Sequence, residues 1–231
     1  MSPDLNHHIR IATPQDVPHI INLKHMLAMN PDNHPESSRG GFVLGCSPEH
    51  YMLLTSLQQI LVATSNDHAH ILGFIVGLDD AILRQSEVWK KQENIEWVQD
   101  FNKDDILPHK IGYLDQLAVH PDAQRQYIGA LLSTSMMHRF AASQHTYVMT
   151  TTLLEPITNT ASIPLIKLAQ GKTVGKIQEH YEGVGHVTSA LHLIHMQRFQ
   201  DNLQQILHEA PPEHQHVITQ SHLIRDALYS S

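Results

Sequence analysis

The spacing of apolar residues changes at position 128, and this change predicts a strand, a loop and a helix in succession. Residues 112–119 form an apolar run that carries one charge, Asp115, as expected of a largely buried strand. Residues 120–126 are polar and include a proline, so they end the strand in a loop. The helix begins at Ile128, and its apolar face consists of Leu131, Leu132, Met136 and Phe140.

The junction of this loop with the helix is a candidate phosphate-binding site. The first N–H groups of a helix lack intrahelical acceptors, and the helix dipole is positive at that end. Gly129 has no side chain, so a ligand can come close to its backbone. We therefore expect the loop and the first helical turn to bind phosphate oxygens through Gln124, Arg125, Gln126, Tyr127, Ile128, Gly129 and Ala130.

The rest of the chain contains further strand and helix patterns. Short β-rich runs predict strands over 9–12, 60–63, 71–77, 147–152, 174–181 and 187–194. Capping residues and helical spacing predict helices after Thr13 and Ser47, and over 159–169, 197–208 and 217–228. Residues 79–110 also show helical spacing and contain both tryptophans. We interpret this segment as an amphipathic helix packed on the domain, with a lid or a homodimer contact as the alternatives.

The composition limits the class of protein. A chain of 231 residues with 41% apolar residues can bury one substantial core. It shows no run of 18 apolar residues, no secretory signal pattern and a single cysteine, Cys46, so we expect a cytoplasmic protein. The 23 acidic and 15 basic residues give a net charge of −8, which argues against nucleic acid and membranes as partners.

Histidine is unusually frequent, with 20 residues in the chain. Several histidines form close pairs, but these pairs are scattered, lie away from cysteine and lack the spacing of a helical metal site. We therefore interpret them as mostly exposed and expect no metal cofactor. A histidine-rich metal-binding protein is the alternative, and a metal titration would test it.

The loop after residue 119 resembles the acyl-CoA-binding motif of the GCN5-related N-acetyltransferases, the GNAT family. The family motif is Gln/Arg-x-x-Gly-x-Gly/Ala, and Gln124 and Gly129 match its first and last positions. Tyr127 replaces the first glycine, so the match requires ordinary helical dihedral angles at Tyr127. Ile166 replaces the tyrosine of a second family motif, whose other matched positions are Asn159, Ser162, Leu165 and Gly175.

This resemblance and the order of the elements imply an α/β fold. We expect a mixed, mostly antiparallel central sheet of six or seven strands, with helices on both faces. Residues 7–196 would form the GNAT-like domain, in which 79–110 is an insertion between the third and fourth strands. Residues 197–231 would form a helical C-terminal extension.

The resemblance also implies an activity, the transfer of an acetyl or other acyl group from acetyl-CoA to a primary amine. The amine would belong to a small molecule or a peptide and would attack directly in a ternary complex. The further coenzyme contacts implied by the resemblance are Leu117, Ala118, Val119, Asn159 and Ser162. The implied acceptor contacts are Arg39, Gly41 and Phe42.

Acyl transfer from a thioester to an amine requires a base for the amine proton and an acid for the departing thiolate. Asp115 alternates with apolar residues on the central strand, so desolvation would raise its pKa and suit it to the role of base. Glu155, after the next strand, is the second candidate base, and Tyr181 is a candidate acid. The alternative for Asp115 is a strand-edge charge that faces water, and the alternative for Glu155 is a loop residue before Pro156.

Two other classes of function bear on these residues. A dinucleotide-binding dehydrogenase does not fit, because its loop requires three glycines and this loop contains one. A non-catalytic acyl-CoA sensor or scaffold remains open, because the second motif has lost its tyrosine. Measuring free CoA released from acetyl-CoA across a panel of amines would separate this alternative from an enzyme.

Overall fold

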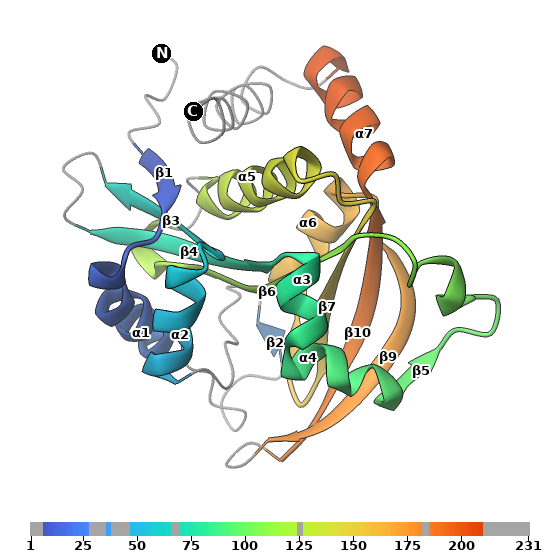
Figure 1. The fold of residues 1–231 in the computed structure, drawn as a ribbon. Helices are drawn as coiled ribbons and strands as arrows, with labels where there is room; N and C mark the ends of the chain where they lie inside the picture. Colours follow the sequence, from blue (N-terminus) through green and yellow to red (C-terminus); the bar gives the residue numbers. More distant parts are fainter. Residues whose placement is uncertain are drawn as a thin grey trace.

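An eight-stranded sheet runs through the protein in the order β1-β3-β4-β6-β7-β10-β9-β5 (Figure 1). The computed structural model describes residues 7–27, 36–37, 47–65, 70–123, 127–181 and 185–209. Neighbouring strands in this sheet are antiparallel except for β6 and β7, which are parallel. The strands are β1 (His7–Ile11), β3 (Ile60–Ser65), β4 (Ile71–Leu78), β5 (Ile95–Trp97), β6 (Ile111–Val119), β7 (Tyr147–Glu155), β9 (Lys172–Tyr181) and β10 (Gly185–His195). A separate parallel pair joins β2 (Glu36–Ser37) to β8 (Thr158–Asn159).

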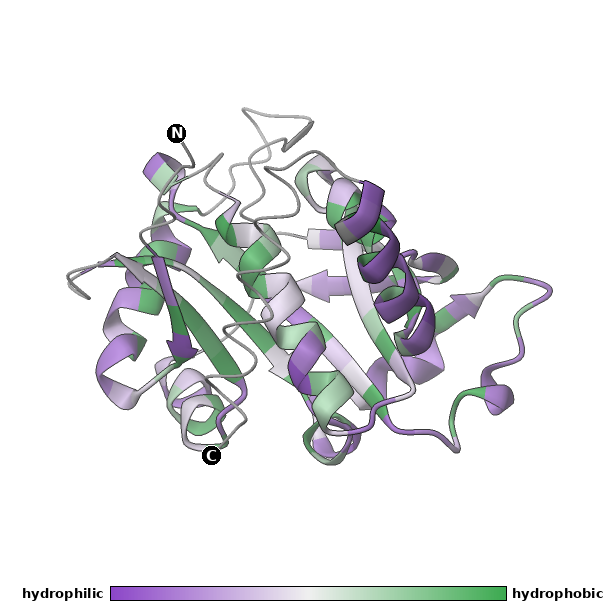
Figure 2. Cartoon of the chain, turned by 90° about the horizontal axis from the view of Figure 1, so that it is seen from above, coloured by the Kyte–Doolittle hydropathy of each residue, from purple (hydrophilic) through white to green (hydrophobic). Residues whose placement is uncertain are grey.

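Helices cover both faces of the sheet (Figure 1). Successive side chains of a strand point to opposite faces of the sheet and pack in two separate core clusters. Val62 and Phe74 belong to the first cluster, and Leu61 and Ile75 belong to the second. The first cluster includes residues of α1 (Val17–Met26), α2 (Pro48–Ser56) and α3 (Asp80–Gln85). The second includes residues of α5 (Ile128–Ala142) and α7 (Met196–Glu209). Figure 2 shows hydrophobic positions concentrated on the strands and hydrophilic ones on the outer helices.

The short 3-10 helix η1 (Pro14–Asp16), which leads into α1, shows how the sequence fixes a local structure. Thr13 and Asp16 form a capping box, in which the Asp16 carboxylate accepts hydrogen bonds from the Thr13 N–H at 2.7 Å and hydroxyl at 2.9 Å. Arg10 donates two further bonds to the same carboxylate, at 2.6 and 2.8 Å. Burial alone would raise the pKa of Asp16, but these bonds outweigh it and hold that pKa below its usual value.

Most of the predicted elements are confirmed with small changes of boundary. The predicted apolar face of α5, Leu131, Leu132, Met136 and Phe140, is buried along its whole length. The predicted strands and the mixed, mostly antiparallel sheet are present, with eight strands rather than six or seven. The structure also contains two short helices, α4 (Glu87–Lys90) and α6 (Ile163–Leu168). The helix predicted over 217–228 lies outside the described residues.

The eighth strand lies in the segment 79–110, where the sequence predicts a helix. We refer to this segment by its predicted role, the insertion. Residues 95–97 instead form β5, which pairs with β9 at the edge of the sheet. Ile95 and Trp97 pack against the first core cluster, while Glu96 between them is exposed. This alternation is typical of an edge strand with one buried face, so the helical prediction is wrong for this part of the insertion.

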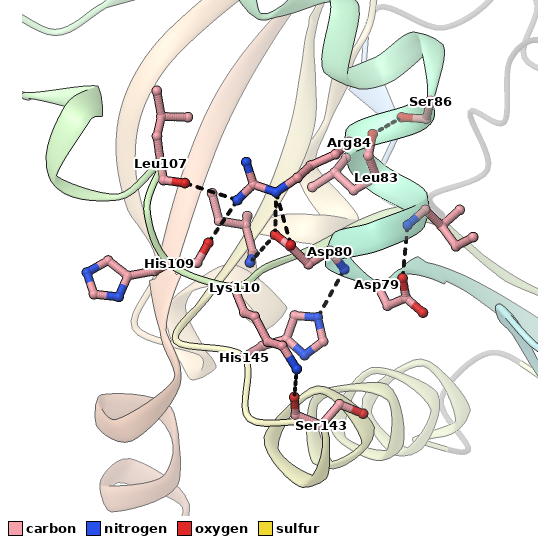
Figure 3. Close-up of polar contacts among 12 residues, drawn as sticks. Asp79, Asp80, Leu83, Arg84, Ser86, Leu107, His109, Lys110, Ser143 and His145 are labelled. Atoms are coloured by element: carbon pink, nitrogen blue, oxygen red, sulfur yellow. Dashed lines mark hydrogen bonds and ion pairs between the residues drawn. The ribbon is translucent and has the colours of Figure 1, made fainter.

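A polar network attaches the insertion to the central sheet (Figure 3). The Asp80 carboxylate accepts from Arg84 Nε with both oxygens at 3.0 Å and from the Ile111 N–H at 2.9 Å. Arg84 Nη2 also donates to the carbonyls of Leu107 and His109. Asp80 and Arg84, near the start of the insertion, therefore bind backbone groups at its end, and these bonds hold the two ends together.

The ring of His145 extends this network towards α5 (Figure 3). Its Nε2 accepts a hydrogen bond from the Asp80 N–H at 3.1 Å, and its Nδ1 lies 3.1 Å from the carbonyl oxygen of Phe140. The ring must be neutral to accept at one nitrogen while it donates at the other. Burial lowers the pKa of His145, in agreement with this arrangement.

Helix α7 packs on the same core as α5. Phe199 and Leu203 are each 2% exposed and belong to the second core cluster. Asn202 Nδ2 donates to the Leu168 carbonyl at 2.7 Å, which joins α7 to α6. The described first part of the predicted extension at 197–231 is thus helical and packs against the second core cluster.

Within the described residues, no helix is long and apolar enough to cross a membrane. The His, Cys, Asp and Glu side chains in this part of the chain form no group of three that could hold a metal ion.

Candidate functional site

The parallel strands β6 and β7 separate halfway along their length. In the described residues they are paired over 111–114 and 147–150, and the pairing ends where Leu114 faces Thr150. The register between β4 and β6 shifts at the same place, because Val76 faces Gln116 while Gly77 faces Leu114. Asp115 is therefore the extra residue of a β-bulge at the point where the two parallel strands part.

A cavity of about 1030 Å³ lies at this separation. Its lining includes Leu117 and Ile128, which pack in the second core cluster, and Tyr113, which packs in the first. Because the two clusters lie on opposite faces of the sheet, the cavity passes between β6 and β7 from one face to the other. One end is formed by α5 and α6, and the other by β9 and the insertion.

The end beside α5 matches the predicted phosphate site in position. Tyr127, Ile128 and Gly129 line the cavity at the start of this 15-residue helix. A Cβ atom on Gly129 would lie 3.6 Å from Val119 and 3.8 Å from Leu117, which are ordinary contacts. Either glycine or alanine therefore fits this position, as in the GNAT motif.

Tyr127 does not have the helical dihedral angles that the motif match requires. Its φ of 58° and ψ of 10° are left-handed, so this condition is not met. Glycine adopts such angles without strain, whereas a residue with a Cβ atom is strained by about 1–2 kcal/mol. The position thus has the backbone that glycine would favour, although the chain places a tyrosine there.

Asn159 and Ser162 lie on the same side of the cavity. Asn159 Oδ1 is buried and has no hydrogen-bond partner among the described residues. Ser162 Oγ donates to the Asn159 carbonyl at 3.0 Å, which fixes the backbone that carries this amide. A buried acceptor without a partner is costly, and a ligand that carries an amide N–H would satisfy it.

The other end of the cavity contains a group of ionisable side chains. Asp115 lies in the wall, where burial raises the pKa of its carboxyl group, as the sequence predicts. Gln116 Nε2 donates to the carboxylate at 3.1 Å, and Gln116 in turn accepts from the Tyr51 hydroxyl at 2.6 Å. Asp115 is therefore both partly desolvated and held in place.

Three further side chains contact one another at this end of the cavity, namely Lys91, Glu179 and Tyr181. Lys91 Nζ forms an ion pair with Glu179, and the Tyr181 hydroxyl donates to the same carboxylate at 2.9 Å. Burial, followed by the neighbouring Glu179 charge, raises the pKa of Tyr181. All three side chains line the cavity that contains Asp115.

The structure brings most of the predicted site residues that it describes to one cavity. Those that line it are Asp115, Leu117, Val119, Tyr127, Ile128, Gly129, Asn159, Ser162 and Tyr181. Ala118, Ala130 and Glu155 are outside this lining, and the Glu155 carboxylate accepts from the Thr188 hydroxyl at 2.9 Å. The remaining predicted residues lie outside the described ranges, namely Arg39, Gly41, Phe42, Gln124, Arg125 and Gln126.

Sequence reasoning did not identify Glu179 or Lys91. Glu179 lies two residues from both Ile177 and Tyr181 along β9, so all three side chains share one face of the strand. This period of two could have identified Glu179 from the sequence. Lys91 lies in the short helix η2 (Lys91–Asn94), 88 residues before its partner, and no local pattern connects them.

No protein-family model and no curated protein matches the chain in sequence. Many solved structures match it in three dimensions. One is Chaetomium thermophilum Naa20 in complex with a bisubstrate analogue, with 16% identity and a TM-score of 0.55 over 84% of this chain and 89% of that one. Another is the Salmonella typhimurium protein yncA with its cofactor acetyl-CoA, with 12% identity and a TM-score of 0.51 over 83% and 94%.

A third similar structure is a GCN5-related N-acetyltransferase from Kribbella flavida. It is 14% identical, with a TM-score of 0.50 over 82% of this chain and 98% of that one. At such low identity the similarity concerns the arrangement of the elements. The chain has the fold of the GNAT N-acetyltransferases.

Proposed function

We propose that the protein is an acyl-CoA-dependent N-acyltransferase that transfers an acetyl group from acetyl-CoA to a primary amine. The observation that carries this proposal is the cavity between β6 and β7, which joins a helix N-terminus on one face to ionisable groups on the other. Such a passage allows two substrates to enter from opposite faces and to meet in the middle, as direct transfer in a ternary complex requires.

The residues at the α5 end suit a coenzyme A. The first N–H groups of α5 would bind its pyrophosphate, and Gly129 leaves room for the approach. The amide-containing pantetheine arm would lie along β6 beside Leu117 and Val119, and its N–H groups offer the donor that Asn159 Oδ1 lacks among the described residues. This side of the cavity therefore fits the coenzyme by both charge and hydrogen bonding.

The residues at the other end suit the chemistry of an amine. We assign the general base to Asp115, which lies in the cavity wall with a raised pKa. It would take a proton from the acceptor nitrogen, directly or through water, while an N–H on the separated edge of β6 polarises the thioester carbonyl. The new C–N bond forms as the C–S bond breaks, and the departing sulfur needs a proton.

We assign the supply of that proton to Tyr181. Burial and the neighbouring Glu179 raise the pKa of this phenol, so it stays protonated near neutral pH, the form a proton donor requires. It lies in the same cavity as Asp115, whereas Glu155 does not line that cavity. The geometry thus favours Asp115 over Glu155 as the base.

One experiment tests this proposal against its alternative, a non-catalytic acyl-CoA sensor. Binding of acetyl-CoA is measured by calorimetry, and free thiol released from acetyl-CoA is measured with and without a panel of primary amines. An enzyme binds acetyl-CoA and releases CoA only when an acceptor is present. Binding without release for every amine favours the sensor, and failure to bind acetyl-CoA contradicts both.

A further inference from the structure

The ammonium group of Lys91 sits in a pocket of the kind that binds alkylammonium ions. Its Nζ contacts the Glu179 carboxylate, lies 3.4 Å from the Tyr181 hydroxyl and is 5.1 Å from the centre of the Tyr181 ring. A carboxylate, a hydroxyl and an aromatic face together satisfy the charge of a primary ammonium and its hydrogen-bond donors. We call this group, formed by Glu179 and Tyr181, the ammonium seat.

The seat belongs to the chain's central cavity rather than to its outer surface. Glu179 and Tyr181 point into the cavity from β9, and their side chains meet there at 2.9 Å. The Glu179 side chain is 16% exposed, whereas that of Lys91 is 38% exposed. The carboxylate is therefore a shielded part of the wall, and the lysine reaches it from the more open side, where the insertion borders the cavity.

We infer that the ammonium seat is the binding subsite for the acceptor amine, and that Lys91 occupies it until the acceptor displaces it. This inference rests on the proposed function and names its substrate class, a linear primary alkylamine whose end resembles that of a lysine side chain. Exchange of one ammonium for another leaves the number of charges in the cavity unchanged. The acceptor nitrogen would then enter the same cavity end as Asp115.

The opposite role for Lys91 is recognition of an acidic group on the acceptor, and the local charges disfavour it. The charge of Lys91 is already paired with Glu179. An incoming carboxylate would meet Glu179 and Asp115 in the same cavity, and like charges at short range repel. Among the described residues, this cavity end has two carboxylates, Asp115 and Glu179, and one cation, Lys91. This balance suits a second cation better than an anion.

The two roles predict opposite effects of Lys91→Met, which removes the charge and keeps a similar length. Without the internal competitor, we expect KM for n-butylamine to fall about threefold to tenfold at unchanged kcat, because the subsite is then always free. Glu179→Gln should raise KM for the same amine at least about tenfold, because it removes the carboxylate that binds the ammonium. Lys90→Met is the matched control, since Lys90 pairs with Glu87 on the open surface.

Direct binding separates this inference from the proposed function. Dissociation constants of n-butylamine and β-alanine are measured by NMR titration in the absence of coenzyme, for the wild type, Lys91→Met and Lys91→Ala. Tighter binding of n-butylamine in both variants supports the inference, even for a protein that transfers no acyl group. Unchanged or weaker n-butylamine binding in folded variants, or loss of β-alanine binding alone, overturns it.

Discussion

The left-handed backbone at Tyr127 leads to a quantitative prediction about stability. Replacing Tyr127 by glycine removes the strain of a Cβ atom at φ 58°, whereas replacing it by alanine keeps that strain. The side chain is lost in both variants, and it is 42% exposed, so the comparison of the two isolates the backbone contribution. Strain relief of about 1–2 kcal/mol, less about 0.4–1 kcal/mol for the greater entropy of unfolded glycine, leaves roughly 0.5–1 kcal/mol in favour of Tyr127→Gly.

Urea unfolding followed by circular dichroism measures this difference. With a slope of about 2 kcal/mol per molar urea, the midpoint of Tyr127→Gly should lie roughly 0.25–0.5 M above that of Tyr127→Ala. Gln144, at φ 59° just beyond α5, provides a matched control away from the cavity, where the glycine and alanine variants should differ by a similar amount. If Tyr127→Ala proves as stable as Tyr127→Gly while the Gln144 pair differs, Tyr127 does not have a left-handed backbone.

Three further predictions concern the coenzyme site, the base and the stability at low pH. Gly129→Asp should weaken acetyl-CoA binding at least about tenfold in calorimetry through repulsion of phosphate, whereas Gly129→Ala, with its nearest contact at 3.6 Å, should bind normally. Asp115→Asn should lower kcat about 10²–10⁴-fold, with partial rescue at higher pH and unchanged coenzyme affinity. Glu155→Gln is its control, and equal losses in both variants would remove the assignment of Asp115. Since the pKa of His145 is lowered in the folded state, its contribution to the free energy of unfolding is complete above its unfolded pKa and is lost as pH falls through the folded value. Urea unfolding at pH 7.5 and 5 should therefore show a smaller loss on acidification for His145→Phe than for the wild type.

The parts of the fold that the sequence predicts correctly are those with a repeated pattern. Helix α5 has apolar residues at every turn, and each of those predicted for its buried face is buried. Strand β5 shows the limit of such patterns, because its three residues are too few to establish a period. Its pairing with β9, about 80 residues later, stabilises it, and no local feature of the insertion reveals this partner.

The same distinction separates the two ends of the candidate site. Asp115 and Gly129 belong to one continuous segment, so the order strand, loop and helix identifies them together. The pair of Lys91 and Glu179 joins η2 to β9, two elements far apart in the sequence that the edge pairing of β5 with β9 brings together. Tyr127 is a different case, because a tyrosine does not predict the left-handed dihedral angles that this position has in the fold.

The separation of β6 and β7 gives a physical reason why one end of the site follows a motif and the other does not. Two consecutive parallel strands need a crossover, and α5 provides it, so the helix starts just past the carboxyl end of β6. The crevice outside that strand end therefore receives a helix N-terminus in any chain of this topology. The opposite end is built from β9 and from the insertion at 79–110, whose length and side chains the topology leaves free. If the ammonium seat binds the acceptor, changes at Lys91 or Glu179 should alter the choice of amine without changing the affinity for coenzyme A, because these residues line the far end of the cavity from α5.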